Sequence, residues 1–405
     1  MSEIRVNSVK GVGASAAAIT VNNTDGTCTA NITSNGGAQL SNRNLCINGA
    51  DMMVAQRGTS TTGLQNSGGI YTIDRFSHRR NGTWSNAQFK HEQVDSGTGL
   101  FKKALKVTCT TAEGSGATGD EGVFIGHYLE KQDTVAAFGD GSAEAKSFTI
   151  SFYVKASIAT TYVLHLTTHH LSTNKLIYKT FVVNSADTWE RKTITFPAIT
   201  NSISTLDGTV ADNAMSYQIH WILDSATGSK AVDTYQSGTG TYQMPTGVNP
   251  TGFANTLNAT FQLSGIQIEA GTVATDLEHR SFGQELTLCQ RYCQAIIHQA
   301  QHQAIALGHA EANNETEVII PFKVQMRATP TFTFGGTLSG AMRVYERGAA
   351  IPNVSAISLV NSGNEAAKMQ TTVDATDLQN GNANLLYFND NPSTPAERLI
   401  FSAEL

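Results

Sequence analysis

The sequence predicts an all-β protein, in which a jelly-roll β-sandwich is preceded by an extended N-terminal arm and followed by a smaller β-sandwich-like C-terminal domain. Two observations favour this fold class. Charged residues make up 15% of the 405 residues, against about 25% in an average globular domain, and Thr, Ser, Asn and Gly fill the difference. Short segments of alternating apolar and polar residues recur along the chain, separated by turn-forming residues. Both features favour strands and turns over helices.

Residues 1–43 contain too little apolar surface to form a core of their own. Tracts rich in Gly, Ala and Ser flank two short alternating pieces, Ala18–Val21 and Cys28–Ile32. Fully extended, at about 3.3 Å per residue, this segment would reach on the order of 150 Å. We therefore expect an arm that is either disordered or ordered against another protein.

Residues 44–282 contain a series of alternating segments without helical periodicity between them. Because each sheet must bury its apolar face, these segments predict a two-sheet sandwich, and a jelly roll is the topology that we expect. Between residues 231 and 257 lies a long Gly-, Pro- and Thr-rich loop, of a length that is usually functional or flexible. The predicted strands are 71–76, 104–109, 148–154, 162–166, 177–183, 191–196, 217–223 and 259–268.

Residues 283–405 are predicted to form a short helix followed by the C-terminal β-domain. The hydrophobic period changes near Phe282, because Leu286, Cys289, Cys293 and Ile296 follow helical spacing. Strand patterns then resume, so the second domain is expected to be smaller than the sandwich and also all-β. The strand patterns cover residues 317–320, 331–334, 342–345, 356–360, 369–373, 385–388 and 399–403.

Composition argues against several classes of protein. The net charge is −6 and no run of Lys or Arg exceeds two residues, so the basic footprint of a nucleic-acid-binding protein is absent from the sequence. No apolar run approaches the roughly 18 residues of a membrane-spanning helix, and Met1–Arg5 does not resemble the start of a signal peptide. The five cysteines are too few and too scattered for a disulfide scaffold. We expect reduced, partly buried thiols, no nucleic acid partner and no membrane insertion.

Metal binding is not predicted from the histidines. His165, His169 and His170 are close in sequence, but four residues along a strand span about 13 Å, and neighbouring strand residues point to opposite faces. His298 and His302 would converge only on a helix, and the metalloprotease pattern is absent there. We therefore expect neither a metal nor another cofactor.

Catalysis is not predicted either, because the chain contains no nucleophile elbow, P-loop or dinucleotide-binding fingerprint. Acidic residues in Gly-rich turns could supply a carboxylate pair for glycoside hydrolysis, but such positions are usually solvated loop residues. These residues are Glu121, Glu130, Asp133, Asp140 and Glu144.

A set of short motifs runs along the chain from Asn42 onward. The motifs are Asn42–Gly49, Val54–Ser60, Tyr71–Phe76, Gly265–Gly271, Glu278–Glu285, Cys289–Tyr292, Met326–Thr331 and Ala403–Leu405. In residues and in order, this set resembles the tail-fibre and virion structural proteins of marine and cyanobacterial phages, with a weaker match at Met1–Val6. Cys46 and Asp51 depart from the residues expected in that family. The motif residues themselves look architectural, and Asp74 is expected to pair with Arg57 or Arg280 at the sandwich edge.

The resemblance implies a carbohydrate-binding-module-like jelly roll carried on a virion. Because the N-terminus lacks the apolar core of a signal peptide, we expect synthesis in the host cytoplasm and exit by lysis rather than export. It implies a tail fibre or receptor-binding subunit that attaches the particle to host-surface glycans. The arm of residues 1–43 would anchor the chain to other virion proteins, and a homotrimer is implied because phage fibres are commonly trimers. Two alternatives remain open: a capsid or baseplate decoration protein with a purely structural role, and a polysaccharide depolymerase.

Sugar binding in a β-sandwich usually needs exposed aromatic faces, because the C–H surfaces of sugars stack on them. Trp84, Tyr235 and Tyr242 fall in predicted loops and are the candidate glycan-stacking residues. Trp189 and Trp221 lie in or beside strand patterns and are expected in the core.

Overall fold

The computed structural model describes residues 44–49, 51–65, 68–82, 84–238, 242–348, 351–389 and 396–405, and the backbone of five short strands before residue 44. These five strands form a three-stranded and a two-stranded antiparallel sheet. The rest of the predicted arm, and the side chain of Cys28, lie outside the described residues. The five strands are β1 (Ser8–Val9), β2 (Ile19–Val21), β3 (Cys28–Ala30), β4 (Ser34–Asn35) and β5 (Ala38–Gln39).

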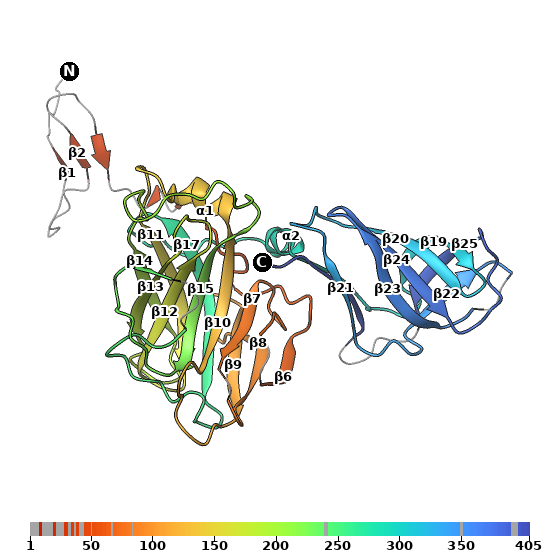
Figure 1. Ribbon diagram of the computed structural model, residues 1–405, viewed down its shortest axis with the longest axis horizontal. Coiled ribbons are helices and arrows are strands. Elements are labelled where there is room, and N and C mark those ends of the chain that lie inside the picture. Colours follow the sequence, from red (N-terminus) through yellow and green to blue (C-terminus); the bar gives the residue numbers. More distant parts are fainter. Residues whose placement is uncertain are drawn as a thin grey trace.

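Two six-stranded antiparallel sheets form the sandwich that the alternating segments predict (Figure 1). We name each sheet after one of its central strands. The β15 sheet has the order β16 (Gln236–Ser237), β13 (Lys175–Val182), β12 (Thr161–Thr168), β15 (Met215–Ser225), β10 (Gly122–Glu130) and β7 (Phe76–Asn81). The β17 sheet has the order β14 (Glu190–Phe196), β11 (Phe148–Ala156), β17 (Thr260–Ala270), β9 (Lys103–Thr111), β8 (Gln88–Asp95) and β6 (Ser60–Leu64).

Alternation along the strands explains how the sandwich core forms. Ile125, Trp221 and Leu164 are cross-strand neighbours in β10, β15 and β12, and all three side chains are buried between the sheets. Phe152 and Val154 of β11 close the core from the β17 sheet. Burying one such side chain contributes roughly 1.5–3 kcal/mol to folding. The predicted all-β sandwich is confirmed, while the helix α1 (Lys131–Phe138) at one end of the sandwich was not predicted.

The C-terminal domain has its own core between two further antiparallel sheets. Val318, Met342, Leu386 and Phe401 are among its buried residues. Its smaller sheet has the order β18 (Cys293–Ile297), β26 (Arg398–Ser402) and β21 (Thr331–Gly335). Its larger sheet has the order β22 (Met342–Glu346), β25 (Ala383–Phe388), β19 (Ala304–Ala312), β20 (Glu315–Pro321), β24 (Ala366–Val373) and β23 (Val354–Ser362).

The helix α2 (Phe282–Gln290) lies between the two domains, where the change of period predicts a helix (Figure 1). It begins with a capping box, in which the Ser281 hydroxyl accepts a hydrogen bond from the backbone N–H of Gln284. The helix ends at Gln290, so the helical spacing predicted through Cys293 and Ile296 is wrong there, and both residues lie in β18.

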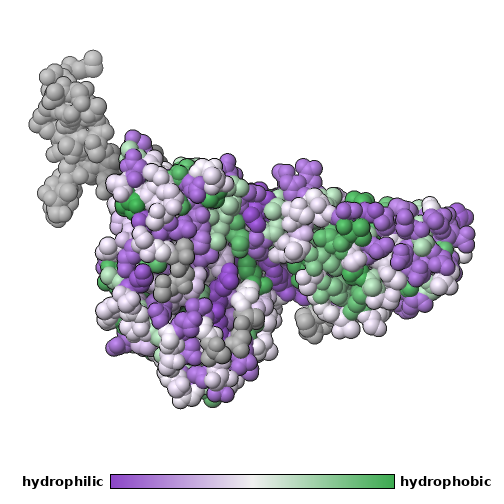
Figure 2. All heavy atoms as spheres, in the orientation of Figure 1, coloured by the Kyte–Doolittle hydropathy of each residue, from purple (hydrophilic) through white to green (hydrophobic). Residues whose placement is uncertain are grey.

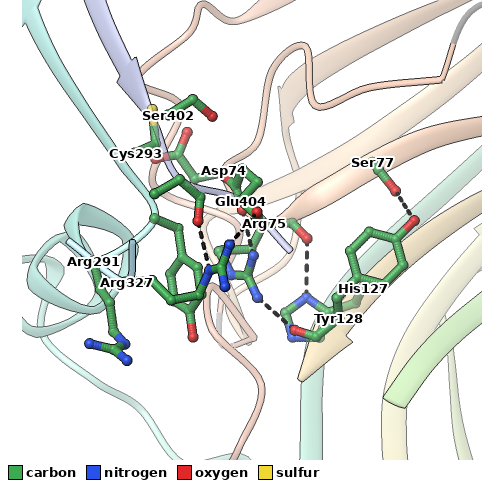
Figure 3. Close-up of polar contacts among 12 residues, drawn as sticks. Asp74, Arg75, Ser77, His127, Tyr128, Arg291, Cys293, Arg327, Ser402 and Glu404 are labelled. Atoms are coloured by element: carbon green, nitrogen blue, oxygen red, sulfur yellow. Dashed lines mark hydrogen bonds and ion pairs between the residues drawn. The ribbon is translucent and has the colours of Figure 1, made fainter. Parts of the chain in front are cut away.

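An ion-pair network at the junction of the domains connects the C-terminus to the sandwich (Figure 3). The carboxylate of Glu404 lies 2.5 Å from Arg75 Nη1 and 3.0 Å from Arg57 Nη2. Arg75 is fully buried, donates to the carbonyl of Tyr128 and stacks 3.5 Å above the ring of Tyr292. A buried guanidinium needs such partners, because an unpaired charge in the interior is strongly unfavourable.

The charged residues of this network belong to the short motifs that were identified in the sequence. Asp74 pairs with Arg57 at 3.5 Å, as predicted, whereas Arg280 pairs with Glu285 at 3.1 Å. Burial raises the pKa of Asp74 to about 6, and the Arg57 charge opposes this effect. Arg327 donates to the backbone carbonyls of residues 213, 403 and 404, so it too bridges the domains. The motifs from distant parts of the chain therefore meet at one interdomain joint.

The predicted strand 71–76 is wrong except at its last residue, because Asp74 and Arg75 belong to this joint and β7 begins at Phe76. Arg75 has a φ of 70°, a left-handed conformation that interrupts extended backbone.

The described cysteines, Cys46, Cys109, Cys289 and Cys293, are buried free thiols. None of the described helices is long and apolar enough to cross a membrane.

Candidate functional site

The outer faces of the two sandwich sheets differ in how they are covered. Every residue of β10, in the β15 sheet, is buried, so both faces of this strand are covered. Met244 and the half-buried Tyr242 and Val248, from the predicted long loop, pack on its outer face against Phe124 and Ile222. In the β17 sheet, by contrast, β8 and β9 alternate between buried and partly exposed residues. The outer face of the β17 sheet is therefore accessible to a ligand over β8 and β9 and over the adjoining ends of β17 and β11. Farther along β17, outward residues such as Gln267 and Glu269 are buried.

Polar side chains follow one row across this accessible surface, which we call the open face. Glu92 of β8 is the cross-strand partner of Lys106 in β9. Lys106 is also opposite Gln262 of β17, and Gln262 is opposite Lys155 of β11. All four are partly exposed. Carboxylate, ammonium and amide groups in one row offer both donors and acceptors of hydrogen bonds. Such a row suits a ligand with many hydroxyl groups.

Three aromatic rings, which we call the aromatic patch, lie at one end of the open face. Trp189 precedes β14, and Tyr153 lies in β11, next to the polar row. Phe101 is buried and contacts both, with ring centroids 4.9 Å from Trp189 and 5.1 Å from Tyr153. Trp189 and Tyr153 are themselves partly exposed. Two partly exposed rings that share Phe101 as a neighbour can each stack on the apolar face of a sugar.

Local backbone features hold the patch in place. The indole N–H of Trp189 donates to the carbonyl of Ser96, at 3.0 Å. Gly265 has a φ of 57°, and a Cβ there would lie 2.8 Å from Cδ2 of Tyr153, so a glycine lets the tyrosine ring lie against β17. The loop after β8 is closed by an ion pair of 2.6 Å between Lys103 and Asp95, whose pKa is lowered by the hydrogen bond from Lys103. The patch is thus ordered before a ligand arrives, which limits the entropy lost on binding.

The three aromatic residues predicted for glycan stacking lie in three different surroundings. Trp84 is 1% exposed and belongs to the sandwich core, so its ring offers no face to a ligand. Tyr235 packs against the same core, its hydroxyl donates to the carbonyl of Pro197, and burial raises its pKa. Tyr242 is partly exposed, but one side of its ring stacks on Phe124 at 4.7 Å. The structure does not bring these three residues together.

Trp189 and Tyr153 are candidate binding residues that sequence reasoning missed. Trp189 was assigned to the core, whereas the structure leaves it partly exposed; Trp221 is buried, as expected. A signal for Tyr153 was present in the sequence, because Phe148, Ile150, Phe152 and Val154 alternate with it and face the core. For Trp189 the signal was the preceding turn, in which Asp187 has a φ of 54°, and this conformation is not apparent from the sequence.

Buried histidines lie on the covered face of the β15 sheet. His165 is the cross-strand partner of His220, and the edge of each ring contacts Tyr242, with centroids 5.7 and 5.0 Å away. Burial lowers the pKa of His165 to about 3, so the ring is neutral at neutral pH. His298 lies just after β18 rather than on a helix, and its ring pairs with Glu397 at 2.8 Å.

Two cavities lie at the junction between the domains. The larger, of about 850 Å³, is lined by residues before β6, the start of α1 and α2. Its arginines are already bound, because Arg280 pairs with Glu285 and Arg291 with Glu130. The smaller, of about 630 Å³, is lined by glutamines and by apolar residues such as Leu286 and Phe322. Figure 2 shows apolar side chains gathered on the visible face of the C-terminal domain, whereas that of the sandwich is mixed.

Comparison with known proteins gives matches in structure only. No family model and no curated protein matches the chain. It is similar to the family 11 carbohydrate-binding module of a cellulosomal cellulase of Clostridium thermocellum, at 14% identity and a TM-score of 0.26, over 55% of this chain and 98% of that one. It is also similar to the CBM22-1 xylan-binding domain of Paenibacillus barcinonensis Xyn10C, at 12% identity and a TM-score of 0.24, over 55% and 100%. Similarity at this level does not identify a ligand.

Proposed function

We propose that this protein is a receptor-binding subunit of a phage tail fibre and that the open face of its sandwich binds host-surface glycans. The observation that carries the glycan part is the aromatic patch, in which Trp189 and Tyr153 present two partly exposed rings beside a row of polar side chains. Stacking holds the sugar, and the polar row selects it through its hydroxyl groups. Binding rather than catalysis is the proposed activity.

The virion part of the proposal rests on the resemblance of the motifs to phage tail-fibre proteins. The structure is consistent with it, because the motif residues Arg57, Arg75 and Glu404 connect the sandwich to the C-terminal domain. A fibre needs such a joint to hold its domains in one orientation. A homotrimer, which the resemblance implies, would present three weak sugar sites together, and avidity would multiply their affinity.

Binding of the purified full chain to host-cell polysaccharide tests the glycan part. We expect Trp189→Ala and Tyr153→Ala each to weaken binding by about fivefold, because one stacked ring contributes on the order of 1 kcal/mol. Tyr345→Ala is the matched control, since Tyr345 is a 48% exposed aromatic residue on the C-terminal domain. Unchanged binding by both open-face variants, with their folds intact, would rule out this site.

Adsorption competition tests the virion part. Saturating wild-type protein should block adsorption of the phage to its host, and Trp189→Ala protein should block it poorly. If the wild-type protein binds polysaccharide but leaves adsorption unchanged, a capsid or baseplate decoration role is favoured. Release of reducing sugar from the polysaccharide would instead indicate a depolymerase.

A further inference from the structure

The outer face of the large C-terminal sheet brings together three potential metal ligands. His309 and Glu311 lie in β19, and Glu317 lies in the neighbouring strand β20. One ligand atom from each residue, an imidazole nitrogen and two carboxylate oxygens, lies within 4.8 Å of the other two. His309 Nε2 and Glu311 Oε2 are 3.3 Å apart. These residues are far in sequence from the open face and belong to another domain.

The backbone places these groups on paired strands rather than on loops. His309 and Glu317 are direct cross-strand partners, so their side chains leave the sheet side by side on the same face. The register shifts between Ala310 and Ala312, which makes Glu311 the extra residue of a bulge. Bulges redirect side chains, and here Glu311 is turned toward His309.

Gly308 permits an unusually close approach of the two strands at this point. A Cβ at Gly308 would lie 1.9 Å from the carbonyl oxygen of Glu317, so a side chain is excluded there. The same strand pairing places Glu317 directly opposite His309, so main-chain geometry brings these two residues side by side.

The charge of the group favours a cation. Glu317 is paired with Lys368 at 2.6 Å, so a single ammonium accompanies the two carboxylates of the group. The side chains of His309 and Glu311 are 51% and 53% exposed, which leaves the site open to ions from solvent. A divalent cation between the three groups would relieve the repulsion between the carboxylates.

We propose that His309, Glu311 and Glu317 form a zinc site. One imidazole nitrogen and two carboxylate oxygens are a ligand set that zinc accepts, with water in the remaining position. Ca²⁺ and Mg²⁺ prefer ligand sets made of oxygen alone, and a site without thiolate does not select Cu(I). The open position is available to water or to a donor from a second molecule.

Calorimetric titration of the chelator-treated full chain with ZnCl₂ tests the proposal. We expect one zinc ion per chain, with His309→Ala and Glu311→Gln each weakening binding by about tenfold or more. Lys368→Gln should strengthen binding, because it frees Glu317 and removes a competing cation. His279→Ala is the matched control, because His279 is an exposed histidine on the sandwich.

CaCl₂ at the same concentration should give no comparable binding. The proposal is overturned if wild-type protein does not bind zinc, or if His309→Ala binds it as tightly as wild type does. It is also overturned if His279→Ala weakens binding as much as His309→Ala does. Circular dichroism of each variant separates loss of a ligand from loss of fold.

Discussion

The joint between the domains should be very sensitive to loss of the charge on Glu404. The substitution Glu404→Gln keeps the size of the side chain but leaves Arg75 without an ionic partner, and Arg75 is fully buried. Breaking a buried ion pair by removing one partner costs about 3–5 kcal/mol. Arg57 retains Asp74, and the Glu404 side chain is 15% exposed, so the lower end of that range applies. We expect the free energy of unfolding to fall by about 3 kcal/mol.

Urea unfolding followed by tryptophan fluorescence measures this loss, because Trp84 and Trp221 report on the sandwich core. The double variant Arg75→Met with Glu404→Gln is the control, because it removes both charges of the pair. Its loss in free energy of unfolding should be smaller than the summed losses of the two single variants by at least about 1 kcal/mol. A loss below about 1 kcal/mol for Glu404→Gln, or strict additivity in the double variant, would refute this account of the joint.

Two further predictions concern acid stability and the aromatic patch. Burial lowers the pKa of three histidines to about 3, and these are His78, His127 and His165. The unfolded chain takes up protons near pH 6.5 but these folded rings do not, so each histidine should lower the free energy of unfolding by about 2 kcal/mol between pH 7 and pH 5. Asp74, whose pKa of about 6 lies above that of an unfolded aspartate, takes up a proton in the folded state and offsets about 1 kcal/mol of this loss. Equal free energies of unfolding at pH 7 and pH 5, measured by urea unfolding, would contradict the prediction. Gly265→Ala should displace Tyr153 and reduce glycan affinity by about the same factor as Tyr153→Ala; a variant that folds and binds like wild type would show that the ring position does not matter.

The fold class could be predicted from the sequence wherever a strand alternates between apolar and polar residues. Phe148–Ala156 has this alternation, and residues 148–154 were predicted as a strand. Gly122–Glu130 is buried on both faces, has no clean alternation and was missed. The strand Gln88–Asp95 was missed for another reason, because the polar residue His91 occupies a buried inward position and interrupts the apolar–polar alternation.

The candidate site was only partly predictable, because it depends on which face of the sandwich is covered. Trp189 and Phe101 lie far apart in sequence, and no local pattern indicates that their rings meet. Arg75 and Glu404 are likewise joined by the fold alone, although both lie in motifs that the resemblance singled out. Trp84 falls in a predicted loop after the edge strand β7, and its ring nevertheless packs in the sandwich core.

Tryptophan fluorescence during titration with an oligosaccharide from the host-cell surface tests the proposed site most directly. Trp84 and Trp221 are buried, so a sugar that stacks on the aromatic patch should change the emission of Trp189 above all. We predict a saturable change in the wild-type protein that disappears in Trp189→Phe. The same saturable change in that variant would place the ligand elsewhere and contradict the account.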